Sequence, residues 1–338
     1  MTRTLAYRFD HLLQITDERG TFEHALLTEP RPEHGYCTDD MARVLVVASR
    51  EPEPAPAVQW LVRLALHFLD EAQGRDGSYR NRMDAEGRWT DASTVEDCWG
   101  RSIWGLGTAA HSELTGVRDS AIAQFERAAQ RRSPWPRAMA FAAVGAAEIL
   151  AVAPQNWAAR RLLADYAGTV IEQGVESGWQ WPEQRLRYAN AVLAEARIVA
   201  GRALGHPALL ERGLKMLAWL IEDHTAGGHL SPSPAEGRGP GDPRPAYDQQ
   251  PIEVSTLADA SARAAEVDPR DIWRTTVMAA MAWFDGDNDL GQPMWDPLTG
   301  GGFDGLHADR VNQNQGAEST LALLSTMQHA QRLSLVPL

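Results

Sequence analysis

Two adjacent aspartates, Asp39 and Asp40, are the residues of this sequence best suited to acid–base chemistry. They fall in the first turn of an expected helix. The helix N-terminus favours ionised carboxyl groups there, while the neighbouring charge raises one of the two pKa values. Two carboxyl groups with different pKa values can act as acid and base, as hydrolysis of a glycosidic bond requires. Simple capping of the helix by acidic residues is the alternative interpretation.

Further carboxylates stand at the starts of other expected helices. Adjacent side chains on a helix point about 100° apart, so only one of the two aspartates need face a substrate. A partner acid from another helix start would then complete the pair. The candidate catalytic residues are Asp39, Asp40, Glu96, Asp97, Glu253 and Glu318.

Amide and aromatic side chains accompany these acids. Amides and acids hydrogen-bond sugar hydroxyl groups, and aromatic faces pack against the C–H faces of sugar rings. The candidate substrate-binding residues are Tyr36, Arg101, Trp179, Trp181, Glu183, Asn190, Tyr247, Asp248, Gln249, Gln250, Asp304, His307, Asn312 and Asn314.

Two details of this set give specific expectations. Trp179 and Trp181 alternate in an extended loop, which would present both rings on one side as a stacking platform. Capping of the hydrophobic core at its rim is the alternative for both rings. Arg101 and Arg137 would orient acids by bidentate pairing, although structural ion pairs explain these arginines equally well.

Histidines offer a different chemistry. His34, His229 and His307 fall in expected loops. A pair of histidines could exchange protons with a sugar carbon during epimerisation or isomerisation, although loop histidines are more often simply solvated. The histidines lack the spacing of a zinc site, and we therefore expect neither a catalytic metal nor a cofactor.

The elements that must position these residues are helical. Apolar residues recur at helical spacing in about twelve segments, and strand-like alternation is almost absent. The expected helices cover residues 5–17, 38–50, 56–73, 94–113, 118–132, 135–152, 156–175, 188–204, 207–224, 249–267, 270–286 and 315–333.

The connections between these segments alternate in length. Five of the six joins that lead from an odd to an even helix are long, whereas the joins from even to odd helices are short. A two-layer ring of helical hairpins has this pattern, because every second loop then lies at the same end. The sequence therefore predicts an all-α (α/α)6 toroid that forms one domain over residues 1–338, with its functional loops at one mouth.

The composition of the chain limits the kinds of molecule that it is expected to bind. The net charge is −13, and no basic cluster that would bind a nucleic acid is present. No run of about 18 apolar residues could span a membrane, and the first residues lack the apolar stretch of a signal peptide. We therefore expect a cytoplasmic bacterial protein that acts on a carbohydrate, with its oligomeric state left open.

The pattern as a whole resembles the six-hairpin glycosidase superfamily. The stretch TDDMARVL (38–45) is similar to the paired-aspartate helix start of bacterial α-1,6-mannanases, which implies nucleophile and acid/base roles for Asp39 and Asp40. Three stretches resemble a bacterial family labelled as related to glycosyltransferases, and imply carbohydrate metabolism. They are EDCWGRSIWGLG (96–107), YDQQPIEV (247–254) and DGLHADRVNQNQGAESTLALL (304–324).

These observations favour a glycoside hydrolase that acts on an oligosaccharide or glycan, with a phosphorylase left open. Two alternatives remain. One is a sugar epimerase or isomerase, because N-acylglucosamine 2-epimerases resemble this helix count and use histidine pairs. The other is a non-catalytic, glycan-binding partner of a glycosyltransferase.

Overall fold

The computed structural model describes residues 9–170 and 179–334, which form twelve α-helices joined by loops with short strands. The helices are α1 (Asp10–Gln14), α2 (Thr38–Ser49), α3 (Pro56–Ala72), α4 (Asp97–Ala109), α5 (Val117–Ala128), α6 (Pro136–Val152), α7 (Trp157–Val170), α8 (Val192–Ala203), α9 (Pro207–Asp223), α10 (Pro251–Ala265), α11 (Ile272–Phe284) and α12 (Ala317–Ser334). A 3-10 turn, η1, covers Pro32–His34.

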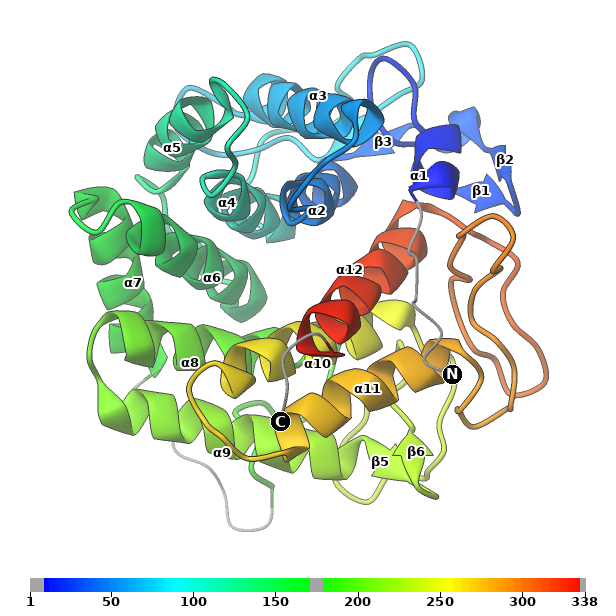
Figure 1. Ribbon diagram of the computed structural model, residues 1–338. Helices are drawn as coiled ribbons and strands as arrows, with labels where there is room; N and C mark the ends of the chain where they lie inside the picture. Colours follow the sequence, from blue (N-terminus) through cyan, green and yellow to red (C-terminus); the bar gives the residue numbers. More distant parts are fainter. Residues whose placement is uncertain (1–8, 171–178, 335–338) are drawn as a thin grey trace.

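The even-numbered helices form a closed inner ring. Each of them contacts the next, and α12 contacts α2 to close the circle (Figure 1). The odd-numbered helices lie outside, where α3, α5, α7, α9 and α11 each pack on the inner helix that precedes them in sequence. The short α1 packs on α12. This arrangement is the predicted (α/α)6 toroid.

Small residues allow the inner helices to approach closely. A Cβ atom at Gly100 of α4 would overlap the backbone of Ala138 in α6, and one at Gly107 would overlap Gly145. The α4–α6 contact is therefore made backbone to backbone. Burial on nearly all sides explains why α6 is apolar around its whole circumference.

The long loops contain three two-stranded antiparallel sheets that helical periodicity did not reveal. Their strands are β1 (Ala25–Leu26) with β2 (Glu29–Pro30), β3 (Tyr36–Cys37) with β4 (Arg82–Met83), and β5 (Thr225–Ala226) with β6 (His229–Leu230). The β3–β4 pair joins two different loops and fixes the chain that leads into α2. Strands of two residues are too short to show a periodic pattern.

Several helix boundaries differ from expectation, including those of α4 and α5, which end at Ala109 and Ala128 and not near 113 and 132. The first helix covers only Asp10–Gln14 of the expected 5–17, whose first residues lie outside the described part of the chain. The eighth helix begins at Val192 and not near 188, because Ala189 adopts a positive φ of 47° that interrupts helical geometry.

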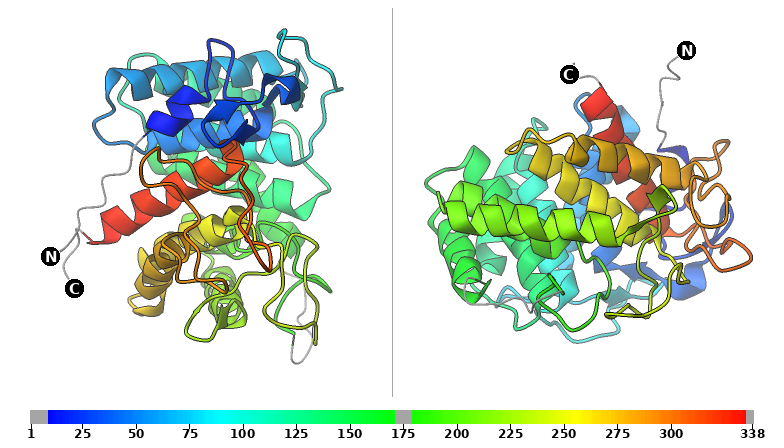
Figure 2. Two further views of the ribbon diagram at one scale, coloured as in Figure 1. Left: turned by 90° about the vertical axis from the view of Figure 1, so that its right-hand side faces the viewer. Right: turned by 90° about the horizontal axis from the view of Figure 1, so that it is seen from below.

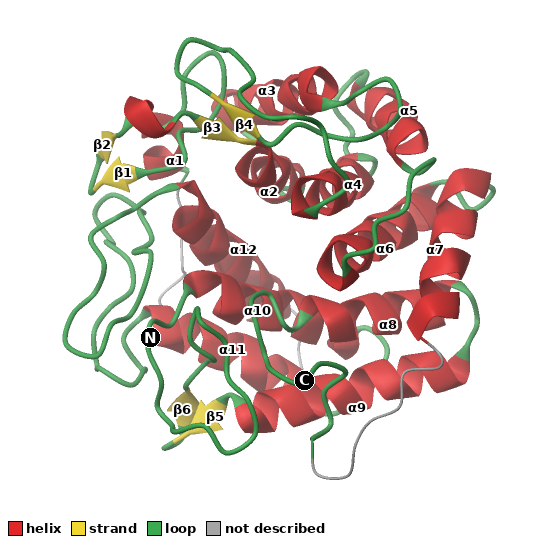
Figure 3. Ribbon diagram, turned by 180° about the vertical axis from the view of Figure 1, so that it is seen from behind, coloured by secondary structure: helices red, strands yellow, loops and turns green. Residues whose placement is uncertain are grey.

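The two ends of the ring are different. Figure 1 looks onto the end where the inner helices finish and the short joins lie, and Figure 3 looks onto the opposite end, where the long loops gather. The side view in Figure 2 shows these loops on one side of the helical ring. We call the loop-bearing end the mouth. Across residues 9–170 and 179–334, the helices lack the combined length and apolar character that a membrane crossing requires.

Candidate active site

Asp39 and Asp40 lie in the first turn of α2 but have different partners. Oδ1 of Asp39 is 3.0 Å from Nη1 of Arg101 on α4, and its Oδ2 accepts a hydrogen bond of 3.1 Å from Asn81. Asp40 is buried, and its Oδ1 accepts a hydrogen bond of 2.5 Å from Arg43 one turn further along α2. Arg101 therefore pairs with Asp39 through one nitrogen and not in the bidentate manner that was expected.

These partners move the two pKa values in opposite directions. Burial alone would raise the pKa of Asp39, but the guanidinium groups of Arg101 and Arg43 reverse the effect and hold this pKa below its usual value. Burial dominates at Asp40 and raises its pKa to about 7, against the opposing charge of Arg43. Near neutral pH, Asp39 is therefore a carboxylate and Asp40 retains a proton for much of the time.

Glu318 approaches the same pair from α12. Its Oε2 accepts a hydrogen bond of 2.5 Å from Nη2 of Arg43, so one buried guanidinium connects Glu318 with Asp40. The Glu318 side chain is 38% exposed, which leaves it accessible to a ligand. The negative charge of Glu318 also contributes to the raised pKa of Asp40.

A second acidic group stands near Glu318 in the loop that leads to α12. Burial, followed by the charge of Glu318, raises the pKa of Asp304 to about 6. The neighbouring Asn314 has a structural role, because its side chain accepts a hydrogen bond from the Ala25 backbone and contacts His24. Asn312 similarly caps its own turn by accepting from the Asn314 backbone.

A pocket of about 430 Å³ opens beside α4 and α6. Its polar lining includes Arg137, whose guanidinium makes the expected bidentate pair with Glu183 at 2.8 and 2.9 Å. Glu96 and Asp97 lie at its edge, and the Asp97 carboxylate is 3.4 Å from Arg101. This salt bridge connects the pocket with the Asp39 side of the site.

The same pocket has aromatic walls that were not among the predicted binding residues. Trp135, the residue before α6, is 54% exposed and lines the pocket together with Tyr188. The Arg137 guanidinium lies 4.9 Å from the centre of the Tyr188 ring and holds that ring in place. The sequence signal that could have revealed Trp135 is its position immediately before the proline that starts a helix.

Glu253 is as buried as Asp40, but it lies on a different inner helix. It lies buried in the first turn of α10 and accepts a hydrogen bond of 2.8 Å from Asn190. Burial raises its pKa to about 7. Its second carboxyl oxygen has no hydrogen-bond partner among residues 9–170 and 179–334.

The predicted tryptophan platform is contradicted by the structure. Trp181 is only 2% exposed, and both Trp179 and Trp181 pack on Trp219 of α9, with ring centroids 5.0 and 6.0 Å away. The Trp179 indole nitrogen also donates to the backbone carbonyl of Glu183. The two rings are held by the outer helix, so the alternative of a hydrophobic rim is the one observed.

Two further predicted binding residues are structural. Tyr36 is buried and donates a hydrogen bond of 2.7 Å to Asp17. Gln249 is fully buried and donates to Asp289 at 2.6 Å. Their neighbours in sequence, Tyr247 and Gln250, remain partly exposed at the mouth.

The loop histidines have separate partners. Nδ1 of His307 lies 3.8 Å from the carboxylate of Asp248, and both side chains are partly exposed. His229 instead pairs with Asp289 at 2.9 Å, which ties it to the loop after α11. His34 packs edge-on against His24. Of these histidines, only His307 pairs with a predicted site residue.

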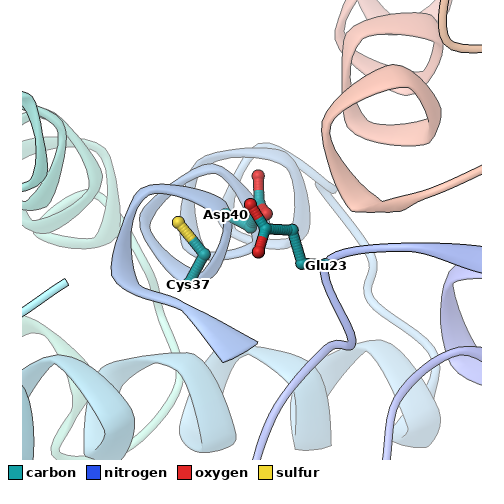
Figure 4. Close-up of side chains that lie close together, drawn as sticks. All are labelled: Glu23, Cys37 and Asp40. Carbon is teal, nitrogen blue, oxygen red and sulfur yellow. The ribbon is translucent and has the colours of Figure 1, made fainter. Parts of the chain in front are cut away.

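Figure 4 shows a cluster of three side chains that includes Asp40. A carboxyl oxygen of Glu23, the Cys37 thiol and a carboxyl oxygen of Asp40 lie within 4.8 Å of one another. Burial and the nearby carboxylates raise the pKa of Cys37 well above its usual value, so the thiol stays protonated. Glu23 and Asp40 are each paired with an arginine, Arg82 and Arg43. This donor set therefore does not fit a metal ion, and its charge instead supports protonation of Asp40.

Comparison with known proteins finds similarity at the level of the fold. No family model matches the sequence, and no curated protein matches it significantly. A sugar epimerase from a ruminal bacterium superposes with a TM-score of 0.75 at 12% identity, covering 99% of this chain and 98% of the epimerase. Cellobiose 2-epimerase from Bacillus thermoamylovorans gives a TM-score of 0.73 at 11% identity, with coverages of 98% and 96%.

A glycoside hydrolase is also similar. It is an α-1,6-mannanase of a Salegentibacter species, solved as an inactive variant with two aspartates replaced by alanine and bound to α-1,6-mannotetrose. Its TM-score is 0.64 at 12% identity, and the match covers 96% of this chain and 98% of the mannanase. At such identities, the likeness establishes that this chain shares the (α/α)6 fold of these proteins.

Proposed function

We propose that this protein is a glycoside hydrolase in which Asp39 and Asp40 provide the two carboxyl groups of the reaction. The observation that carries the proposal is the different environment of these neighbours at the mouth of the ring. Asp39 faces the Arg101 guanidinium and remains ionised, whereas Asp40 is buried among further acids and favours its protonated form. Two carboxyl groups in opposite protonation states are what glycoside hydrolysis requires.

The chemistry follows from these protonation states. Asp40 gives its proton to the glycosidic oxygen as the bond to the anomeric carbon breaks, and Arg43 at 2.5 Å stabilises the carboxylate that remains. Asp39 attacks the anomeric carbon directly or takes the proton of an attacking water. Arg101 fixes the orientation of Asp39 in either case. The surrounding negative charge stabilises the positive charge that develops on the sugar.

The pocket beside α6 supplies a place for a sugar ring. The exposed face of Trp135 can stack on the sugar, while Asp97 and Glu183 accept hydrogen bonds from its hydroxyl groups. Arg101 bridges Asp97 and Asp39, so a ring bound in this pocket lies next to the proposed catalytic pair.

Two further observations support this proposal. The similar mannanase was made inactive by replacing two aspartates, and its ligand is a manno-oligosaccharide. The local stretch TDDMARVL also resembles the paired-aspartate helix start of that class of enzyme. We therefore infer that α-1,6-linked manno-oligosaccharides are the first substrates to try.

A turnover screen tests the proposal. The purified protein is incubated with manno-, gluco-, galacto- and arabino-oligosaccharides, with and without phosphate, and the products are analysed by mass spectrometry and NMR. We expect cleavage of at least one class, with water as the acceptor. Cleavage only in the presence of phosphate would identify a phosphorylase, and tight binding without turnover would favour the glycan-binding alternative.

A sugar epimerase is the second candidate. The similar epimerases have higher TM-scores than the mannanase, and His307 pairs with the Asp248 carboxylate at the mouth. Epimerisation exchanges a proton on carbon, so it would transfer deuterium from D2O to the sugar without cleavage. Loss of that exchange in His307→Ala, with Asp39→Asn and Asp40→Asn still active, would replace the hydrolase proposal with this one.

A further inference from the structure

The end of the ring opposite the mouth contains a second hollow. Two adjoining pockets of about 540 and 610 Å³ share His111, Glu148 and Arg263 in their lining. These residues come from the C-terminal ends of inner helices and the join after α4, on the face seen in Figure 1. We call the combined hollow the rear pocket. Its size is typical of small-molecule sites.

The rear pocket is rich in arginines although the protein is acidic, and three of them pair with carboxylates of the protein. The chain has a net charge of −13, yet the pocket lining has more arginines than carboxylates. The lining arginines are Arg50, Arg160, Arg202, Arg263 and Arg332, and the lining carboxylates are Glu51, Glu148 and Glu266. Guanidinium groups are suited to planar, multidentate recognition of phosphate and carboxylate.

A buried ionic network holds two of these arginines. Asp259 of α10 lies in the core and accepts hydrogen bonds from Arg50 at 2.8 Å and from Ser325 at 3.0 Å, while His329 lies 2.6 Å away. Glu195 of α8 is buried 3.7 Å from Nε of Arg263. Arg263 also pairs with the lining carboxylate of Glu148 and lies 3.6 Å from Glu266, so protein groups balance its charge. The chemistry proposed at the mouth uses none of these groups.

Two polar atoms in the pocket lining lack partners within the described chain. Oε1 of Gln328 and Oγ of Ser49 are buried and make no hydrogen bond to residues 9–170 or 179–334. The Gln328 amide nitrogen donates to the Val47 carbonyl at 2.9 Å, which fixes the side chain. A buried acceptor without a donor is unfavourable, and a ligand hydroxyl group would satisfy it.

Arg332 provides an accessible cation at the rim. Its side chain is 51% exposed, and its nearest charged contact is Glu266 at 3.9 Å. Its other polar contact is His329 at 3.4 Å. Within the described chain, most N–H groups of this guanidinium therefore remain available to a ligand. An anion could therefore engage this guanidinium with little rearrangement.

We propose that the rear pocket is a second ligand site, which binds a small sugar bearing a phosphate group. The arginines take the anionic group, and Gln328 and Ser49 take hydroxyl groups of the sugar. The site is separate from the mouth, since it lies at the other end of the inner helices. The proposal therefore stands independently of the hydrolase assignment.

Calorimetric titration of the full chain with glucose 6-phosphate tests this inference, with glucose and inorganic phosphate as partial probes. We expect saturable one-to-one binding of glucose 6-phosphate and weaker binding of each partial probe. Arg332→Gln should weaken binding about tenfold, as expected for one lost charge-assisted hydrogen-bonding group. Gln328→Met, which keeps the side-chain volume, should weaken the binding of glucose 6-phosphate but not the binding of inorganic phosphate.

Two control variants test whether changes in glucose 6-phosphate binding are specific to the rear pocket. Arg88→Gln changes a largely exposed arginine in a mouth-end loop, and Asp39→Asn changes the proposed catalytic site. Neither should alter glucose 6-phosphate binding. The inference is overturned if no saturable binding occurs, if Arg332→Gln and Gln328→Met bind as tightly as wild type, or if Asp39→Asn abolishes binding. Equal affinity for inorganic phosphate and glucose 6-phosphate would also overturn it.

Discussion

Arg43 of α2 donates a hydrogen bond of 2.5 Å to Glu318 of α12, across the contact that closes the helical ring. The same guanidinium donates to Asp40, which it holds in the first turn of α2. Ring closure and placement of the proposed acid therefore depend on one buried cation. The role of Arg43 in stability can be tested apart from that of Glu318, because Glu318 is partly exposed whereas Asp40 and Arg43 are buried.

Arg43→Met should destabilise the protein strongly. The variant removes the guanidinium that donates to both Asp40 and Glu318, and each buried hydrogen-bonding group left without its partner costs about 1–3 kcal/mol. Urea unfolding followed by circular dichroism measures this change. Glu318→Gln is the matched control, which should cost much less because Glu318 can be solvated. Equal stability of the two variants would show that Arg43 does not hold the ring closed.

The activity should fall as the pH rises through about 7. The proposed acid, Asp40, must carry a proton, and its pKa is raised to about 7 mainly by burial. The lowered pKa of Asp39 places the opposite limb of the profile below the usual range of an aspartate. A pH profile of kcat/KM checks both limbs. An activity that keeps rising above pH 8 would contradict the role of Asp40 as the acid.

Glu253→Gln should stabilise the protein more at pH 8 than at pH 5. The pKa of Glu253 is raised by burial to about 7 in the folded state, so its contribution to stability is complete below pH 4 and is lost as the pH rises through 7. A neutral amide avoids this loss, which amounts to up to about 3 kcal/mol. Melting temperatures of both proteins at the two pH values test the sign. A constant difference would mean that Glu253 is ionised throughout.

Replacement of Trp135 should affect substrate binding, whereas replacement of Trp181 should affect stability. Trp135→Ala removes an exposed ring from the pocket beside α6, so KM should rise about three- to tenfold with little change in melting temperature. Trp181→Ala removes a buried ring that packs on Trp219 and should cost about 3–5 kcal/mol of stability. Kinetics and thermal unfolding of both variants distinguish binding from packing. An unchanged KM for Trp135→Ala would remove this pocket from the substrate path.

The sequence predicts the ring because two independent patterns agree. Helical periodicity locates the segments, and alternation of short and long joins assigns them to two layers with one loop-bearing end. Both patterns involve residues that are close in sequence, so they can be recognised without knowledge of tertiary contacts. The first turns of α2 and α4 could be assigned to the mouth for the same reason, and Arg101 indeed pairs with Asp39.

The direction of loop side chains could not be predicted in this way. Trp179 and Trp181 turn toward Trp219, which lies about 40 residues away in sequence on an outer helix. Tyr36 is held by Asp17, 19 residues earlier in the same long loop, and Gln249 by Asp289 in another loop. An aromatic or amide residue before a helix has the same sequence signature whether it faces a ligand or the core. Only the packing of distant segments distinguishes the two.

The most direct test of the hydrolase proposal compares Asp39→Asn, Asp40→Asn and Asp309→Asn on the oligosaccharide that the wild-type protein cleaves. Asp309 is a largely exposed aspartate in a mouth loop and serves as the control. The account predicts that each variant of the pair loses at least about a hundredfold in kcat while it still binds the sugar. Asp309→Asn should stay at the wild-type rate. Folded Asp39→Asn and Asp40→Asn proteins that cleave as fast as the control would contradict the account.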